Sequence, residues 1–129
     1  MNTQLKDKLQ TKAFTKYFAF FAYSEKQLNE GRNINFDYLS LGGGLICPAI
    51  FCNKLVNRLS AIQAIAIAQV LATHTIKEII WDELANHEAQ ITGNTDDTYN
   101  AVEQYGITRS QVCAEYVDYY NMCVDKGYF

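Results

Sequence analysis

The sequence lacks the residues and patterns that mark several classes of protein. Its 129 residues include one proline and two histidines. It has no Pro-, Gly- or Ser-rich linker, no internal repeat and no low-complexity tract, which argues against repeat architectures and tethered domains. At this length and with nearly half of its residues apolar, the chain is predicted to fold as one domain over residues 1–129.

Long hydrophobic runs are also missing. The most apolar window, Leu59–Leu71, is interrupted by Ser60, Gln63 and Gln69, and it is shorter than the roughly 20 residues that cross a bilayer. The first residues, Met1–Lys6, lack the apolar core of a signal peptide. We therefore expect a cytoplasmic protein without membrane contact, in which the apolar window forms a buried central helix.

The cysteines do not form a recognisable framework. Their spacing matches neither paired C-x-x-C zinc knuckles nor a dense set of secreted disulfides. They are Cys47, Cys52, Cys113 and Cys123. We expect free thiols that serve as small buried apolar side chains.

Signatures of catalysis and metal binding are absent as well. There is no G-x-S-x-G or H-E-x-x-H motif. Glu83 and His87 could present two metal ligands from one helix face, but packing of His87 at the edge of the core is the favoured interpretation. A Cys47 or Cys52 nucleophile paired with His87 rests on composition alone. We expect no enzyme, no metal and no cofactor.

Two short segments resemble ligand loops. The segment with Asn94, Asp96 and Asp97 lacks the glycine and the acidic twelfth residue of a calcium loop. Helix capping explains these three residues. Gly42, Gly43 and Gly44 lie between a predicted strand and a predicted helix, where phosphate loops occur, but without a P-loop lysine or G-x-G-x-x-G spacing. A small-ligand or nucleotide turn is one interpretation, and a tight turn with positive φ angles is the other.

Periodicity predicts a predominantly helical α+β domain, with about five to six helices and a small two- or three-stranded β element. Leu5–Tyr17 has apolar residues at helical spacing and a row of lysines, Lys8, Lys12 and Lys16. Three S/T-x-x-E/Q capping boxes predict further helix starts. They begin at Ser24, Thr75 and Thr108. Extended segments are expected at 18–23, as a buried strand, and at 36–41, followed by a returning strand. Gly31 is expected to end the helix from Ser24 in a left-handed conformation. The helix that starts at Thr75 is expected to reach about residue 90.

Charge is strongly partitioned along the chain. Residues 1–77 carry nine Lys/Arg and four Asp/Glu, whereas residues 78–129 carry two and ten. Tyrosines interleave with the acidic residues, and such a surface suits a basic protein groove. The candidate binding residues are Asp96, Asp97, Tyr99, Glu103, Glu115, Asp118, Tyr119 and Tyr120.

The partner expected from this surface is a host protein or ribonucleoprotein. Direct nucleic-acid binding through the lysine row is disfavoured because the protein is acidic overall. A homo-oligomer is the alternative, formed through opposite charges and the helical seam of Val112, Tyr116, Tyr119 and Cys123.

Three segments together carry a family resemblance. They are Tyr38–Pro48 around the glycine run, Glu83–Ala89, and Tyr105–Thr108. The sequence resembles a family of small uncharacterised proteins of bacteriophages and related mobile elements. Small proteins in that setting often act as stoichiometric inhibitors of host defence, anti-CRISPR proteins among them. The resemblance implies this genomic setting and no mechanism. The role we expect in that setting, inhibition of a nucleic-acid-handling host machine, requires a binding surface instead of a catalytic centre.

Overall fold

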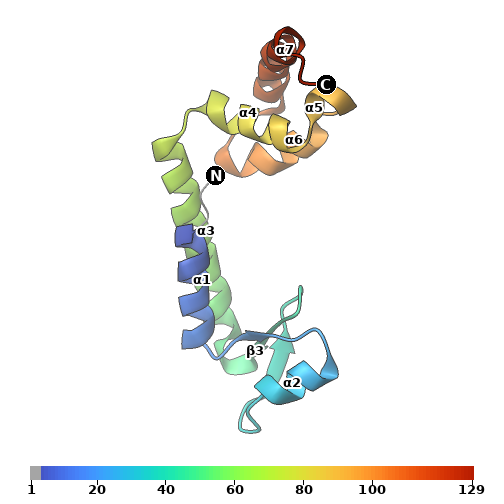
Figure 1. Ribbon diagram of the computed structural model, residues 1–129. Coiled ribbons are helices and arrows are strands. Elements are labelled where there is room, and N and C mark those ends of the chain that lie inside the picture. The colour runs from blue at the N-terminus through green and yellow to red at the C-terminus, as the bar shows by residue number, and fades with distance from the viewer. Residues whose placement is uncertain (1–3) are drawn as a thin grey trace. The chain divides into compact units, whose positions relative to one another are not determined.

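The computed structural model describes residues 4–129 and confirms a predominantly helical α+β fold (Figure 1). Its elements in chain order are α1 (Gln4–Lys16), β1 (Phe20–Phe21), α2 (Glu25–Gly31), β2 (Tyr38–Ser40), β3 (Leu45–Pro48), the 3-10 turn η1 (Ala49–Phe51), α3 (Cys52–Thr73), α4 (Ile76–Asn86), α5 (Ala89–Thr92), α6 (Asp96–Val102), the 3-10 turn η2 (Glu103–Tyr105) and α7 (Arg109–Lys126). They form two compact units, an N-terminal unit ending at Ala66 and a C-terminal unit from Ile67 to Phe129.

The sheet of the N-terminal unit is antiparallel with strand order β1–β3–β2. The central strand pairs Ile46 with Phe20 on one side and Cys47 with Leu39 on the other. The predicted strands are therefore present. The expectation that the first would be buried is wrong, since Phe21 is 46% exposed. It lies in an edge strand, where only one side has a neighbouring strand.

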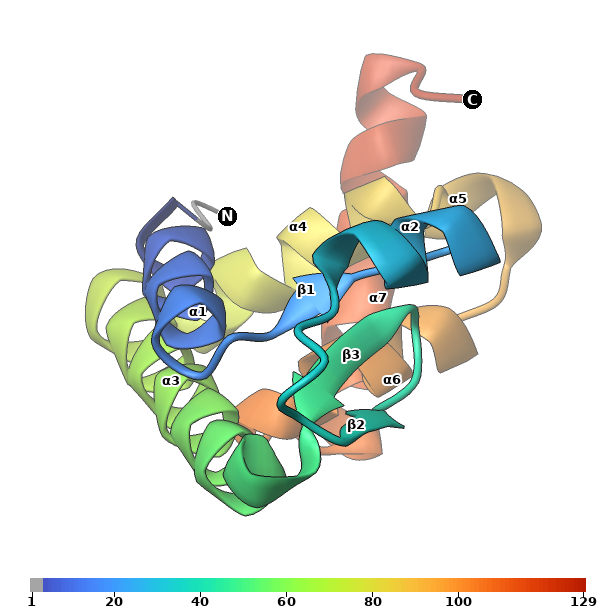
Figure 2. The same cartoon turned by 90° about the horizontal axis from the view of Figure 1, so that it is seen from below.

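Helices α1 and α3 run antiparallel, side by side (Figures 1 and 2). The predicted lysine-bearing helix is confirmed as α1. This unit has one apolar cluster of buried residues, made of Ala13, Leu45, Cys47, Cys52, Leu55 and Ile62. Ala13 is the buried residue of α1 because it is small enough to sit in the helix contact.

The long helix α3 is not the buried central helix that the sequence predicted. Only Cys52, Leu55 and Ile62 of its residues are buried, and Val56 and Ile65 are 46% and 43% exposed. Its apolar pattern covers nearly the whole circumference, whereas α1 and the small sheet cover one side. By length and composition alone, the stretch Ala49–Thr73 would suffice to cross a membrane, which also corrects the expectation that the apolar segment is too short.

Helix α2 shows a variation on the predicted capping box. Ser24 accepts from the Gln27 backbone N–H at 3.2 Å, but the Gln27 side chain accepts from Tyr23 instead of Ser24. The prediction of Gly31 as a left-handed cap is wrong, because Gly31 lies inside the helix. A Cβ at this position would run into the ring of Phe20, so close packing against β1 explains the glycine.

The C-terminal unit has its own apolar cluster, centred on α4 and α7. Its buried members are Ile79, Ile80, Leu84, Ala89, Val102, Ile107, Val112, Tyr119 and Cys123. The capping boxes at Thr75 and Thr108 are confirmed with both reciprocal hydrogen bonds. Helix α4 ends at Asn86, before the expected residue 90, because Glu88 adopts a left-handed conformation with φ of 49°.

The start of α6 differs in detail from the prediction. Thr95 occupies the N-cap position, but its side chain makes no capping hydrogen bond. The side chain of Asn94 does this instead, accepting from the backbone N–H of Asp96 at 2.8 Å. Asn94 and Asp96 are thereby engaged in a helix start, in agreement with the capping interpretation of this segment.

Candidate functional site

Charge follows the division into units. The N-terminal unit carries eight Lys/Arg and four Asp/Glu, whereas the C-terminal unit carries three and ten. The excess of acidic residues therefore belongs to one compact body. Such a body attracts basic partners over a distance set by ionic strength, about 8 Å under physiological salt.

The predicted binding residues on α6 and η2 fall into two kinds. Asp96 pairs with Arg109 at 2.6 Å, and the Arg109 guanidinium lies 4.4 Å from the centre of the Tyr99 ring. The hydrogen bond that Arg109 donates to the Asp96 carboxylate raises the pKa of Arg109. This trio joins α6 to α7 and partly neutralises the surface. Asp97 and Glu103 are the second kind: they are exposed and lie outside this trio.

Two of the predicted residues on α7 belong to the fold. The Trp81 indole N–H donates to the Glu115 carboxylate at 2.7 Å, so Glu115 ties α7 to α4. Tyr119 was expected on the surface, and this is wrong because it is 5% exposed. Its ring meets the Trp81 ring edge-on at 5.4 Å, and burial raises the pKa of Tyr119 to about 12. Its phenol is thus a neutral core group at physiological pH.

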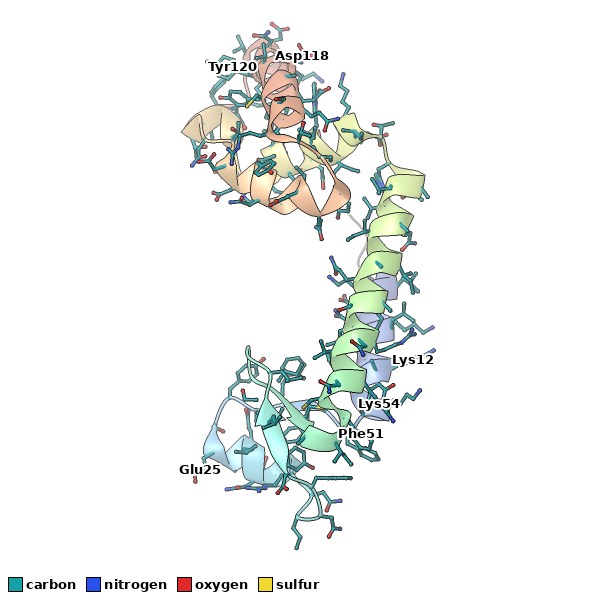
Figure 3. All side chains as sticks on the ribbon, turned by 180° about the vertical axis from the view of Figure 1, so that it is seen from behind. Lys12, Glu25, Phe51, Lys54, Asp118 and Tyr120 are labelled. Carbon is teal, nitrogen blue, oxygen red and sulfur yellow. The ribbon has the colours of Figure 1, made fainter. Side chains whose placement is uncertain are left out.

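Asp118 and Tyr120 are both exposed, but they do not share a face (Figure 3). Residues two apart on a helix are separated by about 200° around its axis. Tyr120 contacts the rings of Tyr116 and Phe129, with centroid distances of 6.1 and 5.7 Å. On α7, therefore, the acidic and tyrosine residues form two flanks instead of the mixed surface predicted from the sequence.

The glycine run forms the turn between β2 and β3. Gly42, Gly43 and Gly44 have φ values of 92°, 61° and 83°. The turn is closed by Leu45, whose carbonyl accepts from Leu41 at 2.8 Å. The returning strand expected after the run is present as β3, which separates the glycines from the next helix start. The positive φ angles of the turn therefore explain the glycines, in agreement with the tight-turn interpretation.

The remaining chemical candidates are engaged in packing. His87 is the C-cap residue that follows α4, and its Nε2 lies 3.4 Å from a Glu83 carboxylate oxygen. Cys47 and Cys52 are buried, as is Cys123, while Cys113 is exposed, so the expectation of free buried thiols holds for three of four. Burial, with Cys52 nearby, raises the pKa of Cys47 to about 12, which disfavours the reactive thiolate. Within residues 4–129, no three His, Cys, Asp or Glu side chains gather as metal ligands.

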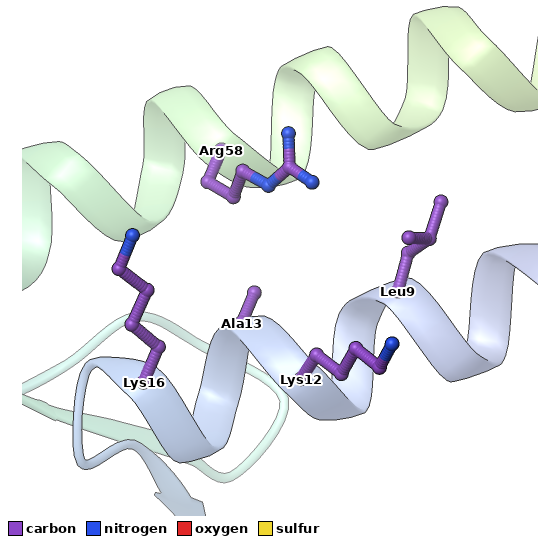
Figure 4. Close-up of a pocket in the computed structure, with 5 residues that line it drawn as sticks. All are labelled: Leu9, Lys12, Ala13, Lys16 and Arg58. Carbon is purple, nitrogen blue, oxygen red and sulfur yellow. The ribbon is translucent and has the colours of Figure 1, made fainter.

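A groove in the N-terminal unit was not found by the sequence reasoning. It lies between α1 and α3, has a volume of about 280 Å³ and is called here the α1–α3 groove (Figure 4). Its lining residues are Leu9, Lys12, Ala13, Lys16 and Arg58. The lysine row is visible in the sequence. No local pattern predicts that Arg58, more than forty residues further along the chain, lines the same groove.

These features describe a helix-rich α+β protein with a basic unit and an acidic unit. The chain belongs to a family of unknown function, DUF7659, whose family model matches residues 1–121. Searches of curated proteins and of solved structures found no match.

Proposed function

We propose that this protein is a non-catalytic inhibitor whose acidic C-terminal unit binds a basic groove of a nucleic-acid-handling host protein or ribonucleoprotein. The supporting observation is the concentration of ten Asp/Glu against three Lys/Arg in one compact unit. Carboxylates on such a surface steer association and compete with nucleic acid for cationic side chains. The lack of a catalytic motif in the sequence agrees with a role exerted by binding alone.

The contact residues proposed within this unit are the exposed carboxylates Asp97, Glu103 and Asp118. They differ from Asp96 and Glu115, which are held by Arg109 and Trp81. Asp96 and Glu115 would have to break these interactions within the protein before they could bind a partner, and this costs free energy. The unpaired acids therefore supply most of the electrostatic attraction in this proposal.

The more specific role, an anti-CRISPR-like inhibitor encoded by a mobile element, rests on the family resemblance described above. In this proposal the protein acts in the bacterial cytoplasm, together with nucleic-acid-handling defence machines. The matched family has no assigned function, so the proposal gains its physical content from the charge distribution.

The test is affinity purification of the tagged protein from its bacterial host at low and high salt, with mass spectrometry of the eluate. The variant is Glu103→Gln with Asp118→Asn, which removes two exposed carboxylates. Its matched control is Glu25→Gln with Asp37→Asn, which changes the net charge equally in the N-terminal unit. We expect a stoichiometric basic partner that is lost at high salt and in the first variant but retained in the control.

The inhibitory part needs a second readout. The captured partner should bind its nucleic acid less well as the protein is titrated in, and the Glu103/Asp118 variant should compete more weakly. A partner that binds both double variants equally would contradict the acidic-surface mechanism. A partner whose nucleic-acid binding and activity are unaffected would contradict inhibition.

Self-association is a second candidate because of two observations. The units carry opposite net charge, and α3 exposes Val56, which a second copy could cover. Sedimentation at low and high salt tests it. A mass that falls to the monomer when salt is raised or when Val56 is changed to serine supports a charge-assisted oligomer, and a monomer at every concentration excludes it.

A further inference from the structure

The α1–α3 groove brings together three cationic side chains from two helices. Lys12 and Lys16 come from α1 and Arg58 from α3, and Figure 4 shows Lys16 and Arg58 extending toward the space between the helices. Ala13 and Leu9 supply its apolar surface. The groove lies wholly within the N-terminal unit.

No carboxylate balances these charges in the groove. Its lining contains no Asp or Glu, and among residues 4–129 no ion pair is formed by Lys12, Lys16 or Arg58. Asp7, the acidic residue of α1, is 140° around the helix from Lys12. Two lysines four residues apart repel each other. Three unopposed cations around an open groove form a surface that an anion would stabilise.

Aromatic rings continue from the groove at the end of α1. The Lys16 ammonium lies 5.4 Å from the centre of the Tyr17 ring, and Tyr17 contacts Phe51. Phe18 stacks near Phe51 with a centroid distance of 6.0 Å, yet it is 57% exposed. Its φ of 57° is a left-handed conformation that costs a phenylalanine energy. The backbone thus holds a large ring exposed to solvent, two residues along the chain from Lys16.

We infer that the N-terminal unit binds single-stranded nucleic acid, with phosphates in the α1–α3 groove and a base stacked on Phe18. Cations that follow a backbone, combined with exposed rings, are the features by which proteins bind single strands without reading sequence. The Arg58 fork can contact two phosphate oxygens, while each lysine acts as a point charge. The open groove favours a polymer, since small-molecule sites enclose most of their ligand.

This inference modifies the sequence-based argument against nucleic-acid binding. That argument used the acidic charge of the whole chain, but the cations reside in a unit with eight Lys/Arg and four Asp/Glu. It is also independent of the proposed function, which concerns the C-terminal carboxylates. The Glu103/Asp118 variant should therefore bind single strands as the unaltered protein does.

The experiment measures binding of a fluorescent oligothymidylate of about 12 nucleotides, within the usual site size of such proteins, by anisotropy at several salt concentrations. Three phosphate contacts predict a slope of log affinity against log salt of about −2. Lys16→Gln with Arg58→Gln should bring the slope to about −0.7. The control Lys26→Gln, at a residue paired with Glu30 on α2, should leave it unchanged.

The stacking contact has a separate signature. Phe18→Leu should weaken binding about 5- to 150-fold with the salt slope unchanged, because it removes a ring and no charge. Circular dichroism establishes that each variant is folded. Absence of binding at low salt, an unchanged slope in the Lys16/Arg58 variant, or preference for a duplex would overturn the inference, as would inorganic phosphate binding in the groove without any oligonucleotide binding.

Discussion

The hydrogen bond between Trp81 and Glu115 offers a sharp test of how the C-terminal unit is held together. Trp81 is the sole tryptophan of the sequence, so its fluorescence reports on this unit alone. Its indole N–H donates to Glu115 at 2.7 Å, and the Lys77 ammonium lies 4.8 Å from the ring centre. Glu115→Ala removes the acceptor, while Glu115→Gln keeps an acceptor and removes the charge.

The expected loss in the free energy of unfolding depends on how far the hydrogen bond is buried. A hydrogen bond to an ionised group contributes about 1.5–3 kcal/mol when it is shielded from water. Trp81 is half-buried, so water can replace part of the lost contact. We expect Glu115→Ala to lower the free energy of unfolding by about 1 kcal/mol and Glu115→Gln by about half of that. With a usual denaturant dependence, the larger change moves the urea midpoint by about 0.3–1 M.

The assay is urea unfolding followed by Trp81 emission, with Glu103→Ala as a control at an exposed carboxylate. The control should stay within about 0.5 kcal/mol of the unaltered protein. Equal shifts for Glu115→Ala and Glu115→Gln, or a shift no larger than the control, would refute the structural role of this hydrogen bond. Glu115 would then count again among the free acids of the binding surface.

Three further predictions concern pH, thiol chemistry and packing. The pKa of Tyr119 is raised to about 12, so the stability that depends on its neutral phenol is complete below about pH 10 and is lost as the pH rises to 12. Unfolding measured at pH 8 and at pH 11 should show this loss of stability. The loss should be smaller in Tyr119→Phe. In the native protein at neutral pH, iodoacetamide should modify Cys113 alone, whereas mass spectrometry in denaturant should show four adducts; several native adducts would contradict the burial pattern. Gly31→Ala should destabilise the N-terminal unit by about 1–3 kcal/mol, because the added Cβ meets the Phe20 ring. In the Phe20→Ala variant the same glycine substitution should be nearly neutral. An equal cost in the unaltered protein and in Phe20→Ala would disprove the ring contact.

Local signals in the sequence were sufficient where neighbouring residues decide the structure. Thr75 with Glu78, and Thr108 with Gln111, place two helix starts because both partners of each capping box lie within four residues. The hairpin around Gly43 is equally local, and its predicted position is confirmed by the structure. The seam through Val112 was expected as a contact between copies, and this is wrong because Val112, Tyr119 and Cys123 are buried in the apolar cluster of their own unit.

Long-range packing decided what local patterns could not. The apolar circumference of α3 suggested burial, but burial depends on how many elements surround the helix. Tyr119 and Tyr120 are adjacent and alike in sequence, yet one is buried against Trp81 and the other is exposed, because α4 covers only one side of α7. Gly31 is required by a ring that precedes it by eleven residues.

The candidate surfaces divide in the same way. The sequence alone determined that positive charge gathers toward one end of the chain and negative charge toward the other, since charge is counted without coordinates. Tertiary structure decided which charges remain available: Asp96 and Glu115 are bound by side chains from other elements, whereas Lys12, Lys16 and Arg58 meet in one groove without a carboxylate. The physical reason is that pairing needs distances of a few ångströms between residues far apart in the chain, and only the folded packing sets those distances.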